Sequence, residues 1–434
     1  MLNFEKSKIN KVGIVGSGTM GSQIAALFAN YGVSVLLLDV ETEKDGVYTN
    51  EIAEKAINRL KEIKPSPIIN ESVLGLIETG NTKEDMKRLN EVDWVIEAVP
   101  ENIKIKKDVW QDISRHVDAR TILTTNTSGI LISSIKSSLP RHLTCRFMGT
   151  HFFNPPRYLK LLEVIPTETT DSEVVDLVTM FAESVLEKGV VICKDVPNFI
   201  GNRLWLFNTM STLKYADKYG IKPDEVDTIT GSLLGRPKSA TFRTMDIVGL
   251  DVLVDICDNL KEYFKGTSEK EFYNVPCYLR ELVKRGWVGA KSGQGIYRKS
   301  EVAGRNVIET IDLSSFEYSS KPRFETPKIL SVSKIDDAGL RIKTLVYDGN
   351  DNISRFVRDV LLSTLIFTAS KSSEIAYDLV SIDKAMKWGF GWELGPFEIW
   401  DVLGLNDSLG LMEKIGMQAP EWVESLSKES KSFY

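Results

Sequence analysis

The fold is decided by residues 11–40, KVGIVGSGTMGSQIAALFANYGVSVLLLDV. This stretch begins with a short β-branched apolar run that predicts a buried strand, continues with a segment of helical composition, and ends in a second apolar run. The first turn carries Gly16, Gly18 and Gly21 in the spacing Gly-x-Gly-x-x-Gly. The order of these elements predicts a βαβ unit whose helix directs its N-terminal amides at a pyrophosphate.

An acid closes the second predicted strand. Asp39 lies 18 residues after Gly21, close to where a carboxylate binds the adenosine ribose hydroxyls and repels a 2′-phosphate. The pattern therefore favours NAD over NADP. The alternative, a tight strand-to-helix turn that binds nothing, is weakened because strand, helix and acid occur together. The cofactor-binding positions predicted in this unit are Gly16, Gly18, Thr19, Met20, Gly21 and Asp39.

Further apolar runs alternate with helix-length segments as far as about residue 195. This alternation predicts a doubly wound α/β sheet of the Rossmann type, so we expect residues 1–195 to form an NAD-binding domain. Residues 41–90 are rich in charge, and we interpret them as a helical insertion after the second strand. The remaining strand candidates are residues 93–99, 121–126, 145–153 and 189–195.

Ligands of such sheets bind at the carboxyl ends of the strands. EAVPENIKIK, residues 97–106, and NTSGI, residues 126–130, each follow a predicted strand. The first segment could line the cofactor or could be a solvated, charge-rich start of a helix. Ser128 in the second segment could contact a substrate or could cap the next helix. Both pairs of alternatives stay open from the residues alone.

A histidine and a glutamate flank a proline turn in GTHFFNPPRYLKLLEVI, residues 149–165. His151 ends a predicted strand, and Glu163 lies within an apolar run twelve residues later. The intervening Asn-Pro-Pro favours a turn that brings a return strand alongside the first. Because a carboxylate in apolar surroundings is costly unless it is paired, we expect Glu163 to pair with the imidazole of His151.

Such a pair has a chemical use. The carboxylate fixes the imidazole tautomer and leaves the other ring nitrogen free to accept a proton from a hydroxyl group as hydride departs. The alternatives are a structural histidine in the core and a glutamate that points outward. The dinucleotide-binding unit favours the catalytic interpretation. His116, in a charged helix, and His142, in a loop, are predicted to be surface residues.

Composition excludes several classes of protein. Among 434 residues the net charge is −6, which provides no basic field for nucleic acid or anionic lipid. No apolar run approaches the roughly 20 residues that cross a bilayer. The four cysteines lie far apart and show no metal-ligand spacing, so we expect no metal site and a reducing, cytoplasmic setting.

Several of these segments carry a family resemblance. GSGTMG, EAVPENIKIK, NTSGI, HFFNPP, LLEVI and KDVPNFIGNRL occur in the order and at about the spacing seen in the L-3-hydroxyacyl-CoA dehydrogenases of fatty acid oxidation. The resemblance covers residues 10–300 and ends in GWVGAKSGQGIY, residues 286–297. It implies NAD-dependent oxidation of a (S)-3-hydroxyacyl-CoA, with an acyl-CoA as the partner molecule and without nucleic acid or membrane partners.

The resemblance also implies roles for particular residues. His151 looks like the catalytic base and Glu163 like its orienting partner. Ser128 and Asn202 resemble the groups that contact the substrate 3-oxygen and the imidazole. The positions that are similar to cofactor contacts near the nicotinamide ribose and the site around it are Ala98, Glu101, Lys106, Ser128 and Asn154. Pro100 differs from the small apolar residue expected beside them.

The C-terminal half contains an internal repeat, within what we expect to be an all-helical part of the chain. We expect a first helical domain at residues 196–300, a polar connector at residues 301–350, and a second, degenerate helical copy at residues 351–434. Asn202 falls opposite Arg358, so the second copy lacks that polar group and is interpreted as structural. The aligned pairs are Asp227/Asp383, Gly235/Gly391, Phe242/Phe397, Asp246/Asp401 and Gly249/Gly404.

The duplication resembles the long form of the family, including the dehydrogenase part of proteins that also carry an enoyl-CoA hydratase. It allows either a monomer with an internal pseudo-dimer or a homodimer. Two alternatives to a complete dehydrogenase stay open. The chain could be an NAD-binding but catalytically idle structural protein, or a dehydrogenase fragment of a larger bifunctional enzyme, fused to or associated with a hydratase.

Overall fold

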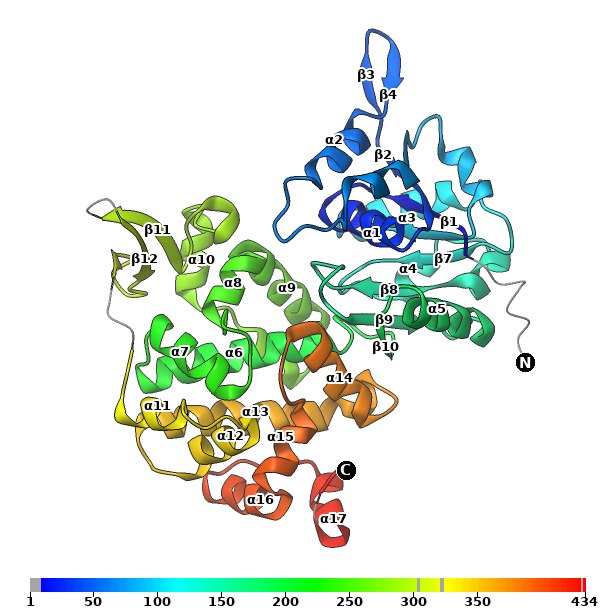
Figure 1. The fold of residues 1–434 in the computed structure, drawn as a ribbon. Coiled ribbons are helices and arrows are strands. Elements are labelled where there is room, and N and C mark those ends of the chain that lie inside the picture. The colour runs from blue at the N-terminus through cyan, green and yellow to red at the C-terminus, as the bar shows by residue number, and fades with distance from the viewer. Residues whose placement is uncertain (1–8, 303–304, 321–323, 431) are drawn as a thin grey trace. The chain divides into compact units, whose positions relative to one another are not determined.

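The computed structural model describes residues 9–302, 305–320, 324–430 and 432–434. The chain separates into two compact units, which are described one at a time (Figure 1). The first unit is Met1–Asn202 with Ser373–Gly389, and the second is Arg203–Ser372 with Phe390–Tyr434. Within the described ranges, no helix is both long enough and apolar enough to cross a membrane.

An eight-stranded sheet forms the centre of the first unit. Its strands follow the order β10-β9-β8-β7-β6-β1-β2-β5, and neighbours from β8 to β5 run parallel. This is the doubly wound arrangement expected from the sequence. The strands are β1 (Lys11–Val15), β2 (Ser34–Asp39), β5 (Ile77–Asn81), β6 (Trp94–Glu97), β7 (Ile122–Thr125), β8 (Phe147–Phe152), β9 (Leu161–Pro166) and β10 (Gly189–Ile192).

Helices cover this sheet because its strands are apolar on both faces. Phe28 packs its ring edge on Trp94, with centroids 5.4 Å apart, and lies against Phe181 at 6.1 Å. All three rings belong to one core cluster with the strand residues. The helices are α1 (Thr19–Asn30), α2 (Glu51–Arg59), α3 (Ile103–Ile113), α4 (Ile132–Lys136), α5 (Ser172–Ser184) and the short 3₁₀ helices η1 (Glu71–Leu76), η2 (Met86–Glu91) and η3 (Arg141–Arg146).

The chain reverses between β8 and β9. These strands pair antiparallel, and their register places His151 directly opposite Glu163. Directly opposed residues on one face have Cβ atoms about 4.5–5.5 Å apart, so the backbone alone brings the two side chains together. The return strand expected after the Asn-Pro-Pro turn is therefore confirmed.

The insertion at residues 41–90 is less helical than expected. It opens with the hairpin β3 (Thr42–Lys44) and β4 (Val47–Thr49), and it contributes the edge strand β5. The prediction of a purely helical insertion was wrong because IETGN has one large apolar residue and a glycine, which gives too weak a pattern for a strand.

Helices dominate the second unit, but its first half ends in strands. The sheet contradicts an all-helical domain, and two helices lie within the expected connector at residues 301–350. The sheet is β11 (Tyr297–Val302), β12 (Arg305–Ile311) and β13 (Tyr318–Ser319). The helices of the C-terminal half are α6 (Gly201–Tyr219), α7 (Pro223–Thr230), η4 (Ser232–Leu234), α8 (Phe242–Val248), α9 (Leu250–Tyr263), η5 (Ser268–Tyr273), α10 (Cys277–Lys284), η6 (Ala290–Ser292), α11 (Pro327–Val332), α12 (Ala338–Tyr347), α13 (Asn352–Ile375), α14 (Leu379–Phe390), α15 (Pro396–Leu403), α16 (Leu405–Lys414) and α17 (Glu421–Glu429).

The two halves of the sequence repeat share backbone geometry. Gly235 and Gly391 are both left-handed, with φ of 62° and 64°. Asp246 accepts hydrogen bonds from the amides of residues 296 and 297, and Asp401 accepts them from the amides of residues 433 and 434. The repeat therefore extends beyond the aligned residues. In each copy it includes a later segment, residues 296–297 or 433–434, whose amides bind the aspartate.

The second copy does not form a separate compact body. Its segment Ser373–Gly389, which includes most of α14, groups with the first unit. The backbone of Cys193 pairs with that of Ala376, and Lys194 N donates to the carbonyl of Ile375 at 3.1 Å. The unit boundaries thus differ from the expected division at residues 195, 300 and 350, because α14 extends the packing of the sheet beyond β10.

Candidate active site

The glycine-rich turn after β1 uses its three glycines for different reasons. Gly16 has φ of +103°, and a Cβ there would lie 2.6 Å from the carbonyl oxygen of Ala98. A Cβ on Gly21 would lie 1.8 Å from the carbonyl oxygen of Gly16. A Cβ on Gly18 would meet nothing within 4 Å. The protein itself therefore needs glycine at the first and third positions, whereas the space beside Gly18 fits a ligand phosphate.

Asp39 closes this turn from the end of β2. Its Oδ2 accepts hydrogen bonds from Ser17 N at 2.5 Å and from Ser17 Oγ at 2.6 Å, and its Oδ1 accepts from Val40 N at 2.7 Å. Thr19 and Met20 are the first residues of α1, so their amides lie at the positive end of the helix. Together these groups form the type of turn that binds a dinucleotide in Rossmann-type domains.

Substitutions at two of the glycines separate cofactor binding from folding. Gly18→Ala should weaken NAD binding by about tenfold or more and leave the free energy of unfolding within about 0.5 kcal/mol of the wild-type value, since its Cβ meets only the ligand. Gly21→Ala should lose about 1–3 kcal/mol of stability because its Cβ overlaps backbone. Titration calorimetry and urea unfolding measure the two quantities. Equal destabilisation by both changes would contradict this division.

The imidazole of His151 is paired with the carboxylate of Glu163. The Nδ1 atom of His151 lies 2.7 Å from Oε2 of Glu163, and the residues are 5% and 0% exposed. Among the described residues, none hydrogen-bonds to Nε2 of His151. The rings of Phe153 and Phe199 lie against the imidazole, with centroids 4.4 and 5.8 Å away. The arrangement holds one ring nitrogen and leaves the other for a substrate.

The second oxygen of Glu163 is bound by backbone. Its Oε1 accepts hydrogen bonds from Gly201 N at 2.8 Å and from Ile200 N at 3.2 Å, at the start of α6. The positive end of that helix stabilises the buried negative charge. The carboxylate is thus fixed at both oxygens, which in turn fixes the plane of the imidazole.

Two residues orient these amides, and nothing in the sequence predicted this role for them. Asn198 and Phe199 both have positive φ, 62° and 50°, which is unusual for residues other than glycine. Asn198 is buried and its Nδ2 has no partner, while Asn tolerates the left-handed region better than most residues. Strain of this kind is held where the surrounding structure needs it, here to turn the amides of Ile200 and Gly201 toward Glu163.

Cys193 also adjoins the pair. Burial and the neighbouring Glu163 carboxylate raise the pKa of the Cys193 thiol well above its ordinary value. The thiol therefore stays protonated and adds no second negative charge next to Glu163. The sequence showed an isolated cysteine near the end of a strand, which indicated nothing about this position.

Ser128 and Asn202 are brought together by the fold. Asn202 is the second residue of α6, and its Nδ2 donates a hydrogen bond to the carbonyl oxygen of Ser128 at 3.3 Å. Both side chains are partly buried, in the same unit as His151. The residues expected at the site thus come from one compact body, although they lie up to 74 positions apart in the sequence.

Two of the contacts expected near the nicotinamide ribose, Glu101 and Lys106, are paired with each other. Lys106 is 1% exposed, and its Nζ lies 2.7 Å from Oε1 of Glu97 and 3.3 Å from Oε2 of Glu101. Ala98 N donates to the carbonyl of Val15 at 2.8 Å, directly beside the glycine turn. Buried Glu97, at the end of β6, was expected only as part of a segment lining the cofactor.

The loop between β8 and β9 has its own anchors. Asn154 is exposed, and its Oδ1 accepts a hydrogen bond from Gln23 of α1 at 3.2 Å. Buried Lys188 donates to the carbonyl oxygens of Pro156 and Leu159, the latter at 2.9 Å. Burial lowers the pKa of Lys188 to about 8. These contacts hold the loop that carries the chain from His151 back to Glu163.

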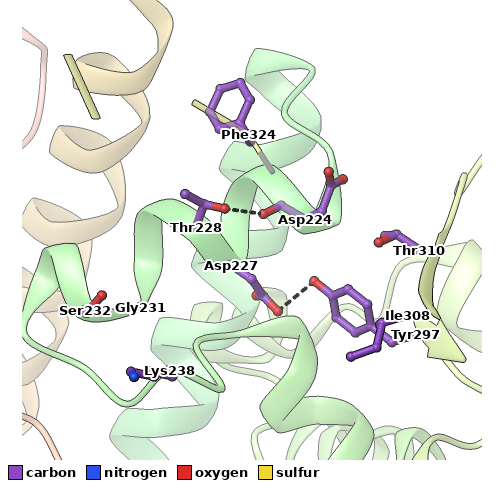
Figure 2. A pocket seen from close by; sticks show the side chains of 10 residues that line it. All are labelled: Asp224, Asp227, Thr228, Gly231, Ser232, Lys238, Tyr297, Ile308, Thr310 and Phe324. Atoms are coloured by element: carbon purple, nitrogen blue, oxygen red, sulfur yellow. Dashed lines mark hydrogen bonds between the residues drawn. The ribbon is translucent and has the colours of Figure 1, made fainter. Parts of the chain in front are cut away.

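A cavity of about 500 Å³ lies in the second unit. Figure 2 shows the side chains that line it. One lining acid, the half-buried Asp227, accepts hydrogen bonds from Thr241 N, Phe242 N and Arg243 N at the start of α8 and from the Tyr297 hydroxyl. Desolvation raises the pKa of Asp227 to about 7. The four hydrogen bonds show that Asp227 holds the start of α8. The lining residues are Asp224, Asp227, Thr228, Gly231, Ser232, Lys238, Tyr297, Ile308, Thr310 and Phe324.

The sheet, the glycine turn and the acid at the end of β2 define a dinucleotide-binding domain. The buried histidine and glutamate add a candidate proton acceptor within the same unit. Residues 11–196 match the sequence model of the 3-hydroxyacyl-CoA dehydrogenase NAD binding domain. Residues 199–299 and 356–431 match that of the 3-hydroxyacyl-CoA dehydrogenase C-terminal domain. The chain belongs to the 3-hydroxyacyl-CoA dehydrogenase family, which confirms the resemblance and NAD as the cofactor.

Relatives support this membership. The chain is 39% identical over 440 aligned residues to a Bacillus subtilis protein named probable 3-hydroxyacyl-CoA dehydrogenase, covering 98% of this chain and 55% of that protein. A Deinococcus radiodurans protein of the same name is 40% identical over 68% of this chain and 84% of its own length. The chain thus spans about half the length of the Bacillus relative.

A solved structure shares the fold over nearly the whole chain. The crystal structure of 3-hydroxybutyryl-CoA dehydrogenase from Escherichia coli K12 aligns with a TM-score of 0.72 at 21% identity, covering 97% of this chain and 99% of that one. At this identity the likeness concerns the fold alone. It confirms the Rossmann-type sheet followed by a helical C-terminal part.

Proposed function

We propose that this protein oxidises a (S)-3-hydroxyacyl-CoA to the 3-oxoacyl-CoA with NAD as the hydride acceptor, in fatty acid β-oxidation or short-chain acyl-CoA metabolism. The observation that carries the proposal is the buried pair in which Nδ1 of His151 lies 2.7 Å from Glu163, while no described residue binds Nε2. A histidine held in this way can remove the proton of a secondary alcohol. Family membership supplies the substrate class.

In this mechanism Glu163 keeps the proton of the neutral imidazole on Nδ1, so that Nε2 is an acceptor. Nε2 takes the proton from the 3-hydroxyl group, and the imidazolium that forms is stabilised by the adjacent carboxylate. Bound NAD supplies the ring that accepts hydride from C3. Ser128 and Asn202 are proposed to bind the substrate 3-oxygen and to orient the imidazole, and the rings of Phe153 and Phe199 exclude water.

We propose that cofactor contacts come from two parts of the first unit. The turn from Gly16 to Gly21, with Thr19 and Met20, would bind the pyrophosphate, and Asp39 the adenosine ribose. The open space beside Gly18 supports this placement. The residues proposed to contact the nicotinamide half are Ala98, Glu101, Lys106, Ser128 and Asn154.

The duplicated C-terminal part supports a monomer with an internal pseudo-dimer. Within the second unit, the long helices α6 and α13 of the two copies pack together, with the rings of Phe207 and Phe367 stacked at 3.8 Å. Arg358 binds the carbonyls of Val346 and Gly349, as expected of a structural residue.

We place the protein in the cytoplasm, which agrees with its four unpaired cysteines. The proposal of an enoyl-CoA hydratase fused to it or associated with it draws on two Rickettsia relatives, 31% and 30% identical, that are named putative fatty acid oxidation complex trifunctional enzyme.

The second candidate function is an NAD-binding protein without catalysis. The retention of Ser128, His151, Glu163 and Asn202 in one unit argues against it, because a structural protein has no need of a buried carboxylate that orients an imidazole whose other nitrogen binds no described residue.

Purified protein, NAD and (S)-3-hydroxyacyl-CoAs of short, medium and long acyl chains test the proposal. We expect NADH to form with at least one chain length, and the reverse reaction to proceed with NADH and the matching 3-oxoacyl-CoA. The ratio of kcat/KM values gives the chain-length preference. Binding of NAD without turnover of any chain length would favour the idle homologue instead.

A further inference from the structure

The carboxylate of Glu101 lies at the centre of the turn that carries Ser128. Its Oε1 accepts hydrogen bonds from Thr127 Oγ1 at 2.6 Å, Ser128 N at 2.9 Å and Gly129 N at 3.2 Å. Two successive amides and a hydroxyl group therefore converge on one oxygen. A carboxylate oxygen with three donors has no lone pair left for a further partner.

The other oxygen of Glu101 is tied to a buried ion pair. Lys106 Nζ lies 3.3 Å from Oε2 of Glu101 and 2.7 Å from Oε1 of Glu97. Glu97 is fully buried and also accepts hydrogen bonds from Thr125 Oγ1 at 2.7 Å and from Trp110 Nε1 at 3.3 Å. Glu101 is thus anchored to a rigid group of side chains from β6, β7 and α3, although it is itself partly exposed.

Ser128 is consequently held on both sides of its Cα atom. Glu101 binds its amide, and Asn202 Nδ2 donates to its carbonyl oxygen. Neither contact uses the Ser128 hydroxyl, which stays available for a substrate. Without Glu101, the amides of Ser128 and Gly129 would lose their acceptor and the turn would lose its link to α3.

We propose that Glu101 is a positioning residue that fixes the turn of residues 127–129 and, through it, the hydroxyl of Ser128. The proposal rests on the function proposed above, in which Ser128 binds the substrate 3-oxygen. It adds to the ribose contact implied by the family resemblance, since only Oε2 of Glu101 has capacity left for such a contact. A misplacement of about 1 Å in a binding group can lower the rate by about 10²-fold.

The first test needs no activity. Amide hydrogen exchange is measured on the cofactor-free protein for the wild type, Glu101→Ala and Glu168→Ala. Glu168 is an exposed glutamate outside the site and serves as the matched control. We expect exchange at Ser128 and Gly129 to become faster by about tenfold in Glu101→Ala alone, because alanine removes the oxygen that accepts from both amides, while the amides of β7 keep their protection. Unchanged exchange at both amides would overturn the proposal even if the protein proves to be a dehydrogenase.

The second test is a double-mutant cycle of Glu101→Ala and Ser128→Ala. We expect Glu101→Ala to lower kcat by about tenfold or more in the wild-type background but by less than about threefold beside Ser128→Ala, because both changes act through one hydroxyl. Equal losses in the two backgrounds, or a change confined to NAD affinity, would leave Glu101 as a cofactor contact only. Thr127→Val, which removes one donor to Glu101, should reproduce part of the loss if the variant Glu101→Ala fails to fold. A wild-type protein without any dehydrogenase activity would instead refute the proposed function, and the exchange result would then stand alone.

Discussion

Replacing His151 with glutamine should lower kcat for NADH formation by about 10²–10⁴-fold, the range that a positioned general base contributes. Glutamine has a similar reach and can still hydrogen-bond to Glu163, but its amide cannot accept the proton of the 3-hydroxyl group. NAD affinity should change little, because His151 belongs to β8 and the glycine turn follows β1. Steady-state kinetics and titration calorimetry measure the two quantities.

The matched control is His142→Gln, since His142 is exposed in a short helix before β8. It should keep wild-type kinetics. If His151→Gln retained full kcat, the proton acceptor would have to be another group, and the mechanism given above would be wrong.

Exchanging Glu163 for glutamine should have an effect of similar size for a different reason. The amides of Ile200 and Gly201 require an oxygen at the position of Oε1, so the new NH₂ group must face Nδ1 of His151. Nδ1 then becomes the acceptor, the ring proton moves to Nε2, and Nε2 can no longer take a proton. We expect kcat to fall by about 10³–10⁴-fold, the loss typical of a wrong histidine tautomer, with thermal stability little changed.

Glu163→Ala separates the effect of the histidine tautomer on kcat from the effect of Glu163 on folding stability. It removes the acceptor of two buried amides and should cost about 2–4 kcal/mol of the free energy of unfolding, because these donors are left unsatisfied. Urea unfolding of the two variants checks the difference. The account would be contradicted by a glutamine variant that is as unstable as the alanine variant, or by one that retains catalysis.

Much of this site could be predicted because its signals are local. The pairing of His151 with Glu163 followed from an Asn-Pro-Pro turn between two apolar runs, and antiparallel register then fixed the contact. The glycine turn and Asp39 followed from spacing within one βαβ unit. In each case a few neighbouring residues restrict the backbone so strongly that tertiary packing has little freedom to alter the result.

The parts that escaped prediction depend on distant contacts. Nothing in IETGN indicates a strand until β2 offers it an edge to pair with. The left-handed residues Asn198 and Phe199 turn the amide of Ile200 toward Glu163, which lies 37 residues before Ile200 in the chain. The role of Glu101 likewise becomes visible only when residues 127–129 are placed around its carboxylate.

The repeat also combines features that local sequence signals predict with features that depend on distant contacts. Its matched glycines and aspartates identified the duplication, and the structure shows both aspartates binding the amides of a later segment. What the alignment could not indicate is that α14 of the second copy groups with the first unit. That outcome follows from long-range packing, such as Gly189 against Trp388, where a Cβ would lie 2.3 Å from the ring.

The most direct test of the central claim is a crystal structure of the protein with NAD and a 3-oxoacyl-CoA bound. The account predicts that the 3-oxygen lies within about 2.6–3.2 Å of His151 Nε2, with C3 facing the nicotinamide ring and Glu163 still bound to Nδ1. A 3-oxygen that binds elsewhere, with no contact to the imidazole, would contradict it.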